Sequence, residues 1–246
     1  SNYSKLTKGG SILVDHSMVY FPYCTGDIYS GKHITFYKNK KPVFHTGYSN
    51  VIKAIKVLKE KDILSKDVND LVVYGSSAGS FGALIHGKNF GIEVSPTAKK
   101  TMFVDSPGLH WTPKVFDKFS AKLISDFDYS FKNIGIDVDR NNGLLASQMD
   151  NFCQKHNDWK IGFLSSDGDF IMSRVFGRIK SKKFKKLVYS EGGILTAVEK
   201  QPNCSAWIHP SITHTFLLIK PSYRKKVDGM SARGFVDRVY SGDTSR

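Results

Sequence analysis

The chain has 246 residues, of which 40% are hydrophobic and 13% aromatic. This length and composition suffice for one large domain with a buried core, and they exclude a largely disordered chain. Lys and Arg number 36 against 22 Asp and Glu, and the formal net charge of +14 favours attraction to polyanions. The sequence shows neither a signal peptide nor an apolar stretch long enough for a transmembrane segment.

Two further composition signals argue against metal and nucleic-acid binding. The densest basic run, 180–186, holds five lysines around Phe184, and no RNP, helix-turn-helix or zinc-finger pattern accompanies it. We interpret the run as a solvated helix end and expect no specific nucleic-acid partner. The cysteines Cys24, Cys153 and Cys204 allow at most one internal disulfide. They form no C-x-x-C pair, so we expect no metal site.

Hydrophobic periodicity predicts alternating strands and helices along the chain. In chain order the strands are expected at 18–23, 33–37, 71–74, 101–104, 160–164 and 205–208. The helices are expected at 51–58, 78–86, 144–156, 171–179 and 231–240. This order predicts an α/β fold with a mainly parallel central sheet and helices on both faces. No internal repeat or low-complexity linker interrupts the chain, so we expect a single domain over 1–246.

One segment, 109–142, is rich in aromatic and charged residues without a clear period. Two interpretations remain open. The segment is either a cap inserted over an active site or a set of irregular helices whose aromatic side chains pack into the core.

A G-x-S-x-G pentapeptide occupies 75–79, directly after the apolar run 71–74 and before an apolar helix. That setting is typical of a nucleophile elbow, in which a tight turn presents a serine to a histidine and to backbone amides. Ser77 is then the nucleophile, the amide of Ala78 forms part of the oxyanion hole, and the two glycines provide room. Ser76 and Ser80 are the neighbouring alternatives. A glycine-rich turn without chemistry is the other interpretation, because the pentapeptide alone is a weak signal.

An elbow serine needs an acid and then a histidine later in the chain, each on a loop after a strand. Asp167 and Asp169 follow the strand expected at 160–164, and His214 lies in a loop beyond the strand at 205–208. His209, five residues earlier and next to Pro210, competes with His214. Asp105, after the strand at 101–104, is a further candidate acid.

The order of five motifs resembles the pectin acetylesterase and Notum family of α/β-hydrolase-like carboxylesterases. The motifs are FPYCTGD at 21–27, HTGYSN at 45–50, YGSSAGS at 74–80, DS at 105–106 and ITHT at 212–215. The similarity extends from Met18 to the C-terminal helix. It implies Ser77 as nucleophile, His214 as base and Asp169 as acid, with Asp167 the alternative. It also makes Asp105 structural.

The sequence departs from the family upstream of 21–27. Family members carry a glycine-rich segment there, with a cysteine, whose amides form half of the oxyanion hole. Here only Gly9 and Gly10 correspond to that segment. Either they are a remnant of it or the oxyanion hole is incomplete. The cysteine missing from this segment would explain an unpaired Cys24. Thr25 and Asp27 either support the active-site mouth or form a local Asx-type turn.

The resemblance implies a serine carboxylesterase that hydrolyses an O-acyl ester through an acyl-enzyme, without a cofactor. The acyl group would be carried by a polysaccharide, including an anionic one, or by a protein or lipid, and this chain would be secreted or extracytoplasmic. Specific substrate-binding residues and the oligomeric state are not indicated. The alternative is a non-catalytic protein on the same scaffold that binds a polyanion through its basic surface.

Overall fold

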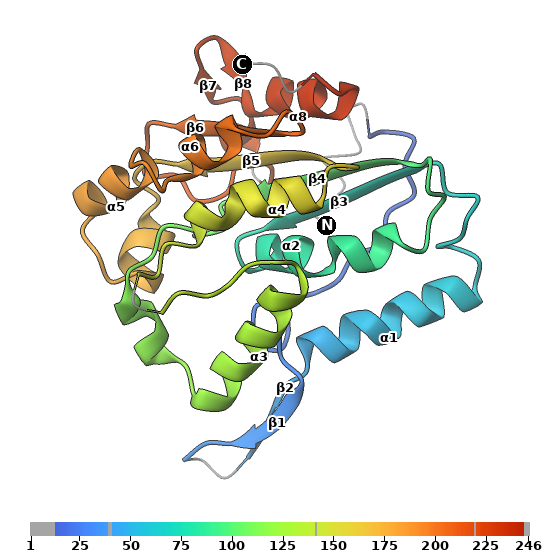
Figure 1. Ribbon diagram of the computed structural model, residues 1–246, viewed down its shortest axis with the longest axis horizontal. Helices are drawn as coiled ribbons and strands as arrows, with labels where there is room; N and C mark the ends of the chain where they lie inside the picture. Colours follow the sequence, from blue (N-terminus) through green and yellow to red (C-terminus); the bar gives the residue numbers. More distant parts are fainter. Residues whose placement is uncertain (1–12, 39–40, 141, 219, 244–246) are drawn as a thin grey trace.

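Figure 1 shows the computed structural model, which describes residues 13–38, 41–140, 142–218 and 220–243. Its centre is a four-stranded parallel sheet in the order β3-β4-β5-β6. The strands are β3 (Asp70–Ser76), β4 (Lys99–Asp105), β5 (Lys160–Ser166) and β6 (Cys204–His209). The register pairs Ser76 with Asp105 and Ser166 with His209, so all four strands end together at one carboxyl edge.

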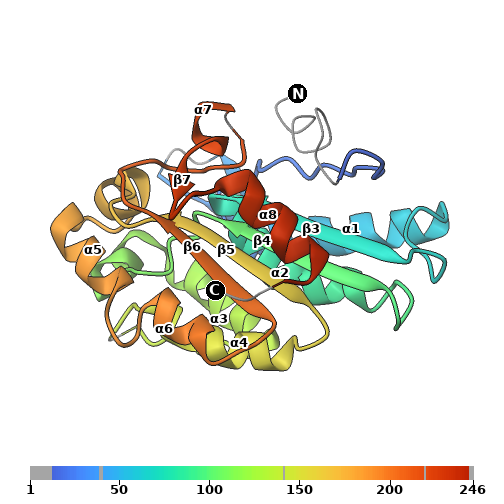
Figure 2. The same cartoon turned by 90° about the horizontal axis from the view of Figure 1, so that it is seen from above.

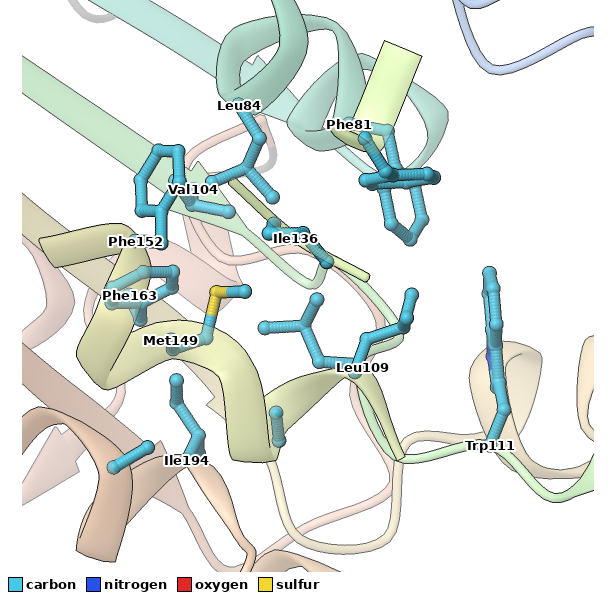
Figure 3. Close-up of a cluster of buried hydrophobic side chains, with 14 of the residues drawn as sticks. Phe81, Leu84, Val104, Leu109, Trp111, Ile136, Met149, Phe152, Phe163 and Ile194 are labelled. Carbon is cyan, nitrogen blue, oxygen red and sulfur yellow. The ribbon is translucent and has the colours of Figure 1, made fainter. Parts of the chain in front are cut away.

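Both faces of this sheet are buried, and alternate residues along each strand serve opposite faces. On β4, Met102 and Val104 join the main hydrophobic cluster, whereas Phe103 joins a second cluster on the other side. Phe163 and Leu164 divide in the same way on β5. Figure 3 shows part of the main cluster. The strands are therefore nearly continuous apolar runs, which explains why the sequence predicted them.

Helices cover the sheet on both sides (Figure 2). The main cluster lies under α2 (Ala78–Gly91), α3 (Ala121–Asn133), α4 (Met149–Lys155) and α6 (Ile194–Glu199). The opposite face is covered by α8 (Ala232–Ser241), whose Phe235, Val236 and Val239 are buried. At the β3 side, α1 (Gly47–Glu60) packs against α2 through a third cluster that includes Val51 and Ile55. A mainly parallel sheet with helices on both faces is thus confirmed.

Shorter elements complete the chain. An antiparallel hairpin of β1 (His33–Phe36) and β2 (Pro42–His45) precedes α1, and α5 (Ser181–Val188) carries the lysine run. In α5, Phe184 and Val188 are buried while its lysines are exposed, so the run forms the outer side of a helix. The remaining short elements are the 3₁₀ helices Pro113–Lys118 and Leu145–Gln148, α7 (Lys220–Tyr223), β7 (Lys226–Val227) and β8 (Met230–Ser231).

Two expected elements differ from the structure. The prediction of a strand at 18–23 is wrong, because this segment pairs with no strand; residues 19–22 instead line a cleft beside α1. The helix expected at 171–179 is a π-helix, Ile171–Phe176. The hydroxyl of Ser173 is buried, and the Ser173 amide bonds the carbonyl of Asp169, so this turn is fixed to the carboxyl edge. The helix expected at 144–156 is present, beginning with a 3₁₀ turn before α4.

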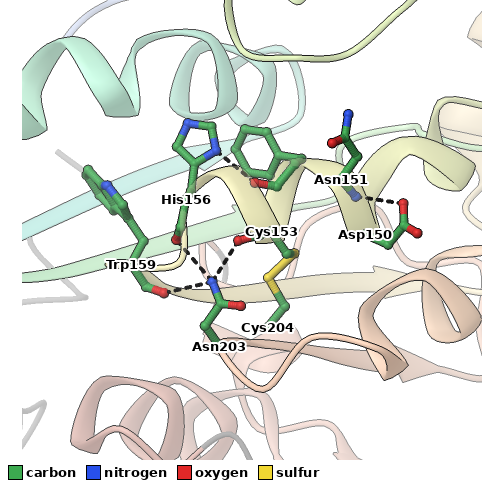
Figure 4. The surroundings of a disulfide bond; sticks show 8 residues. Asp150, Asn151, Cys153, His156, Trp159, Asn203 and Cys204 are labelled. Carbon is green, nitrogen blue, oxygen red and sulfur yellow. Dashed lines mark hydrogen bonds between the residues drawn. A yellow bond between two sulfur atoms is a disulfide. The ribbon is translucent and has the colours of Figure 1, made fainter.

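Cys153 and Cys204 form a disulfide that joins the end of α4 to the start of β6, and Cys24 is free and exposed. Beside the disulfide, the side-chain amide of Asn203 donates to the carbonyl oxygens of Cys153, His156 and Trp159 at 3.0–3.1 Å (Figure 4). One buried amide therefore satisfies three carbonyls at the helix end that leads into β5. The disulfide and these bonds together fix α4 against the sheet.

The aromatic segment 109–142 contributes directly to the main core. Trp111, Phe116, Phe127 and Phe131 are all buried in the main cluster, and Phe81 of α2 contacts two of them. This packing favours the core interpretation of the segment, while a cap over the site stays a prediction. None of the helices in the described part of the chain has the length and apolar character needed to cross a bilayer.

Candidate active site

Ser77 stands at the turn between β3 and α2, with φ 56° and ψ −122°. A residue with a side chain rarely adopts this backbone, so the turn is strained and must be held by its surroundings. The amide of Ser77 donates to the carbonyl of Asp105 on β4 at 2.8 Å. A Cβ on Gly75 would lie 1.8 Å from the carbonyl oxygen of Gly79, whereas a Cβ on Gly79 meets no atom within 4 Å. The need for room is therefore confirmed at Gly75 and not at Gly79.

The structure brings Ser77, His214 and Asp169 together in one hydrogen-bonded series. Ser77 Oγ lies 2.8 Å from His214 Nε2, and His214 Nδ1 lies 2.8 and 3.1 Å from the two carboxylate oxygens of Asp169. Asp169 is fully buried, and the His214 side chain is 17% exposed. The partners assign the proton of the neutral imidazole to Nδ1, where it points at a carboxylate, leaving Nε2 to accept from the serine hydroxyl.

Backbone pairing beyond the sheet places the acid beside the histidine. After β5 and β6 end, the amides of Asp167, Gly168 and Phe170 donate to the carbonyls of His209, Ser211 and Ile212 at 3.0–3.2 Å. The two loops therefore continue side by side. Asp169 is fixed further by the amide of Met172, which donates to its carboxylate at 2.9 Å. The π-helix after Asp169 thus supplies a donor that orients the carboxylate.

Asp167, the alternative acid, has a different partner. Its carboxylate lies 2.6 Å from Lys185 Nζ on α5, and the Tyr189 hydroxyl is 3.4 Å away. The hydrogen bond to Asp167 raises the pKa of the Lys185 ammonium. Asp167 is 5% exposed and its charge is balanced by this lysine. The structure therefore brings Asp169, and not Asp167, into contact with His214.

The competing candidate His209 and two further histidines, His86 and His110, have other surroundings. His209 packs against the rings of Trp207 and Phe216, and burial lowers its pKa. His86 Nε2 lies 2.9 Å from the carbonyl of Tyr29, and burial lowers the His86 pKa to about 4. His110 Nε2 accepts the amide of Ile194 at 3.2 Å, and burial lowers its pKa to about 3. These rings stay neutral near pH 7, and none of them is the hydrogen-bond partner of Ser77.

The pair Asp105–Ser106 holds the loop that carries His214. The Asp105 carboxylate is fully buried and accepts the amides of Phe216 and Leu217 at 2.9–3.0 Å. Ser106 Oγ accepts the amide of Thr215 at 3.0 Å and donates to Asp105 at 3.2 Å. Three consecutive amides after His214 are thus bound by one dipeptide.

Burial raises the pKa of the Asp105 carboxyl, and the bonds from these amides and from two serine hydroxyls oppose that rise. Ser76, one of the two serines considered as alternatives to Ser77, donates its hydroxyl to the Asp105 carboxylate at 3.2 Å. Ser80, the second alternative to Ser77, donates its hydroxyl to the carbonyl of Ser77. The sequence indicated a structural Asp105, but its link to the histidine loop carried no sequence signal, because the partners are backbone amides about 110 residues away.

Ala78 is the first residue of α2, so its N–H has no carbonyl partner within the helix and can face a ligand. The positive end of the helix dipole favours negative charge at this point. Gly9 and Gly10, the expected second half of an oxyanion hole, lie outside the described residues. Within the described part of the chain, no group of three His, Cys, Asp or Glu side chains is placed to hold a metal ion.

The loop around Asp27 forms a local turn that is held by the Asp27 carboxylate. Asp27 is fully buried and accepts from the Thr25 hydroxyl at 2.6 Å, the Tyr29 amide at 3.1 Å and the Gly47 amide at 2.7 Å. The bond to the amide two residues on is the expected Asx-type bond. Nearby, a cleft of about 480 Å³ opens between segment 19–25 and α1, lined mostly by apolar side chains. Neither Ser77 nor His214 lines this cleft.

Comparison with known proteins supports the fold. No protein-family model matches the chain, and no curated protein sequence matches it. Among solved structures, one crystal form of the Wnt deacylase Notum from Drosophila aligns with a TM-score of 0.50 at 14% identity, over 90% of this chain and 67% of that one. A second crystal form gives 0.49 at 15%, over 92% and 68%. The chain therefore has a Notum-like, α/β-hydrolase-like fold.

Replacing each of the two aspartates in the 165–169 loop should lower kcat by very different factors. Asp169→Asn leaves an amide where His214 needs an acceptor, and a comparable change in a triad lowers kcat about 10⁴-fold because the imidazole takes the wrong tautomer. Asp167→Asn removes the partner of Lys185 and should lower kcat less than about tenfold. Hydrolysis of p-nitrophenyl acetate by the two purified variants measures the difference. A larger loss in Asp167→Asn would show that the acid is wrongly assigned.

Ser106→Ala tests whether the Asp105–Ser106 pair positions His214. Losing the acceptor of a buried amide should destabilise the protein by about 1–3 kcal/mol, and displacement of the loop should lower kcat about 10- to 100-fold with KM nearly unchanged. The matched control is Ser130→Ala, another fully buried serine, whose hydroxyl donates to the carbonyl of Ser30. The control should lose stability and keep kcat. Equal losses of kcat in both variants would show that Ser106 contributes to folding stability and does not specifically position His214.

Proposed function

We propose that the protein is a serine carboxylester hydrolase. The observation that carries the proposal is the unbroken series from Ser77 Oγ to His214 Nε2 and from His214 Nδ1 to Asp169, with 2.8 Å at each step. It starts from a serine on a strained strand-to-helix turn, the position in which such folds expose a nucleophile. The three groups come from three separate loops at one edge of the sheet, so their alignment is a property of the fold.

In this mechanism Ser77 Oγ attacks the ester carbonyl carbon while His214 Nε2 takes the hydroxyl proton. The carbonyl oxygen becomes an oxyanion, which the amide of Ala78 stabilises at the helix N-terminus. His214 then gives its proton to the departing alkoxide, leaving an acyl group on Ser77. Water, deprotonated by the same nitrogen, attacks the acyl-enzyme, and the carboxylic acid leaves as Ser77 regains its proton. Asp169 orients the imidazole and stabilises its charged form throughout.

The substrate we propose is an O-acyl ester carried by a larger molecule, either an acetylated polysaccharide or an acylated protein or lipid. The solved structure with a similar fold is named a Wnt deacylase, which is an activity on an acylated protein. The net charge of +14 favours an anionic carrier by raising its local concentration at the surface. We further propose an extracytoplasmic site of action, which the disulfide supports, since such bonds persist mainly in oxidising compartments.

A non-catalytic polyanion-binding protein on the same scaffold is the second candidate. The charge supports it, and so does the departure of the sequence from the family at the upstream glycine segment. Against it stand the strained backbone of Ser77 and the buried carboxylate behind His214, because neither contributes to binding a polyanion. Strain of this kind persists where function requires it.

A fluorophosphonate probe separates the two candidates, since it phosphonylates a serine only where a base and an oxyanion site activate it. We expect stoichiometric labelling on the peptide that contains Ser77, and none in Ser77→Ala. Ester hydrolysis by Ser77→Ala should fall at least about 10³-fold. Ser76→Ala is the matched control: its hydroxyl bonds Asp105 beside the elbow, and the variant should still be labelled.

A folded wild-type protein that takes up no probe would overturn the hydrolase in favour of the binding protein. Labelling that persists in Ser77→Ala would move the nucleophile to another residue. A matching circular dichroism spectrum and melting temperature show that each variant is folded before it is compared.

A further inference from the structure

The β1–β2 hairpin presents an apolar face to solvent. The register pairs Ile34 with Phe44 and Phe36 with Pro42, so these four side chains point to the same side of the ribbon. Their side is the exposed one: Phe36 is 68% exposed, Phe44 53% and Ile34 47%. Large apolar side chains gathered on one exposed face are typical of a surface that binds something apolar.

The opposite side of the hairpin is fixed to the body of the protein. His33 and His45 are buried on that side, and His45 Nδ1 lies 2.8 Å from the carbonyl of Thr25. The amide of Lys32 donates to Asp126 of α3 at 2.8 Å, and His33 Nδ1 contacts the same carboxylate. The apolar face is therefore held in a defined orientation. Figure 1 shows the hairpin projecting from the body beside α3.

The chain segment that contains the hairpin is rich in lysine. From 28 to 59 the sequence contains seven lysines and no Asp, Glu or Arg, so this segment alone carries +7 of the net +14. Lys38 and Lys41 flank the hairpin strands and are exposed. Aromatic and aliphatic side chains beside lysines suit a boundary between an apolar layer and an anionic surface. A soluble anionic polymer would meet the lysines but would leave Phe36 and Phe44 in water.

The hairpin lies toward the edge of the sheet that carries Ser77. Helix α2 starts at the carboxyl edge, immediately after Ser77, and returns to the amino edge before β4. Helix α1 ends before β3 begins, so its C-terminus is at the amino edge and its N-terminus at the carboxyl edge. The hairpin leads directly into that N-terminus. The base of the hairpin therefore lies toward the carboxyl edge.

We propose that the exposed face of the hairpin, Ile34, Phe36, Pro42 and Phe44, docks on an anionic lipid surface. The apolar side chains enter the boundary between headgroups and acyl chains, and Lys38 and Lys41 contact anionic headgroups. Docking of this kind is reversible. The proposal concerns binding and stands whether or not Ser77 hydrolyses an ester.

Co-sedimentation with vesicles tests the proposal on the full chain. The wild type should bind vesicles of phosphatidylcholine with about 30% phosphatidylserine, bind pure phosphatidylcholine at least about tenfold more weakly, and lose most of its binding in high salt. Phe36→Ser with Phe44→Ser should lower the partition coefficient at least about tenfold by removing buried apolar area. Lys38→Glu with Lys41→Glu should lower it by at least the same factor.

Two control variants match these changes elsewhere on the molecule. Ile92→Ser removes an apolar side chain that is 59% exposed at the end of α2, on the amino edge. Lys182→Glu with Lys183→Glu changes the net charge equally on the exposed side of α5. Both should bind vesicles within about twofold of the wild type. A control that loses as much binding as its hairpin counterpart would overturn the proposal in favour of general charge or hydrophobicity.

Absence of wild-type binding to anionic vesicles would also overturn it. Size-exclusion chromatography tests whether the face instead binds a second copy of the chain. If the wild type is a dimer that binds no vesicles, and Phe36→Ser makes it a monomer, the face is a dimer interface. Because Phe36 and Phe44 are exposed, their replacement removes no core packing. A melting temperature equal to that of the wild type checks that the variant is folded.

Discussion

The candidate site depends on a single dipeptide at the end of β4. The Asp105 carbonyl accepts the amide of Ser77, and the Asp105 carboxylate and Ser106 hydroxyl accept the three amides that follow His214. One point therefore fixes both the strained turn and the loop of the base. A buried carboxylate without hydrogen-bond donors is costly. Moving the His214 loop would remove the donors of Asp105, so this cost holds the loop in place. Strain at Ser77 can persist because these bonds oppose its relaxation.

Three aspartates at the same edge of the sheet have three different environments. Asp105 accepts backbone amides, Asp167 is paired with Lys185, and Asp169 accepts from His214 and from the Met172 amide. Each carboxylate has a full set of partners, so no carboxylate competes with another for the imidazole. Asp167 and Asp169 are distinguished by their partners: the Asp167 carboxylate pairs with Lys185 of α5, whereas the fully buried Asp169 carboxylate accepts from His214.

The sequence predicted much of the fold and the identity of the three site residues that the structure brings together, although their roles in catalysis stay a prediction. The strands at 71–74, 101–104, 160–164 and 205–208 were found because both faces of the sheet are buried, which produces unbroken apolar runs. Segment 18–23 is equally apolar but pairs with no strand and borders a cleft beside α1, and composition does not distinguish those two uses. The pairing of Cys153 with Cys204 depends on three-dimensional contact, as does the partner of Asp167. The acid-free stretch 28–59 was visible in the sequence, but its meaning depends on which hairpin face is exposed.

The central claim is that Ser77 becomes acylated through His214 and Asp169. The most direct measurement mixes the protein rapidly with p-nitrophenyl acetate, quenches it in acid, and locates the acetyl group by mass spectrometry of the digested chain. The account predicts a burst of p-nitrophenol of about one equivalent, with the acetyl group on Ser77 appearing at the rate of the burst. Steady release of p-nitrophenol with no acetyl group on Ser77, or with acetyl groups spread over lysines alone, would contradict it.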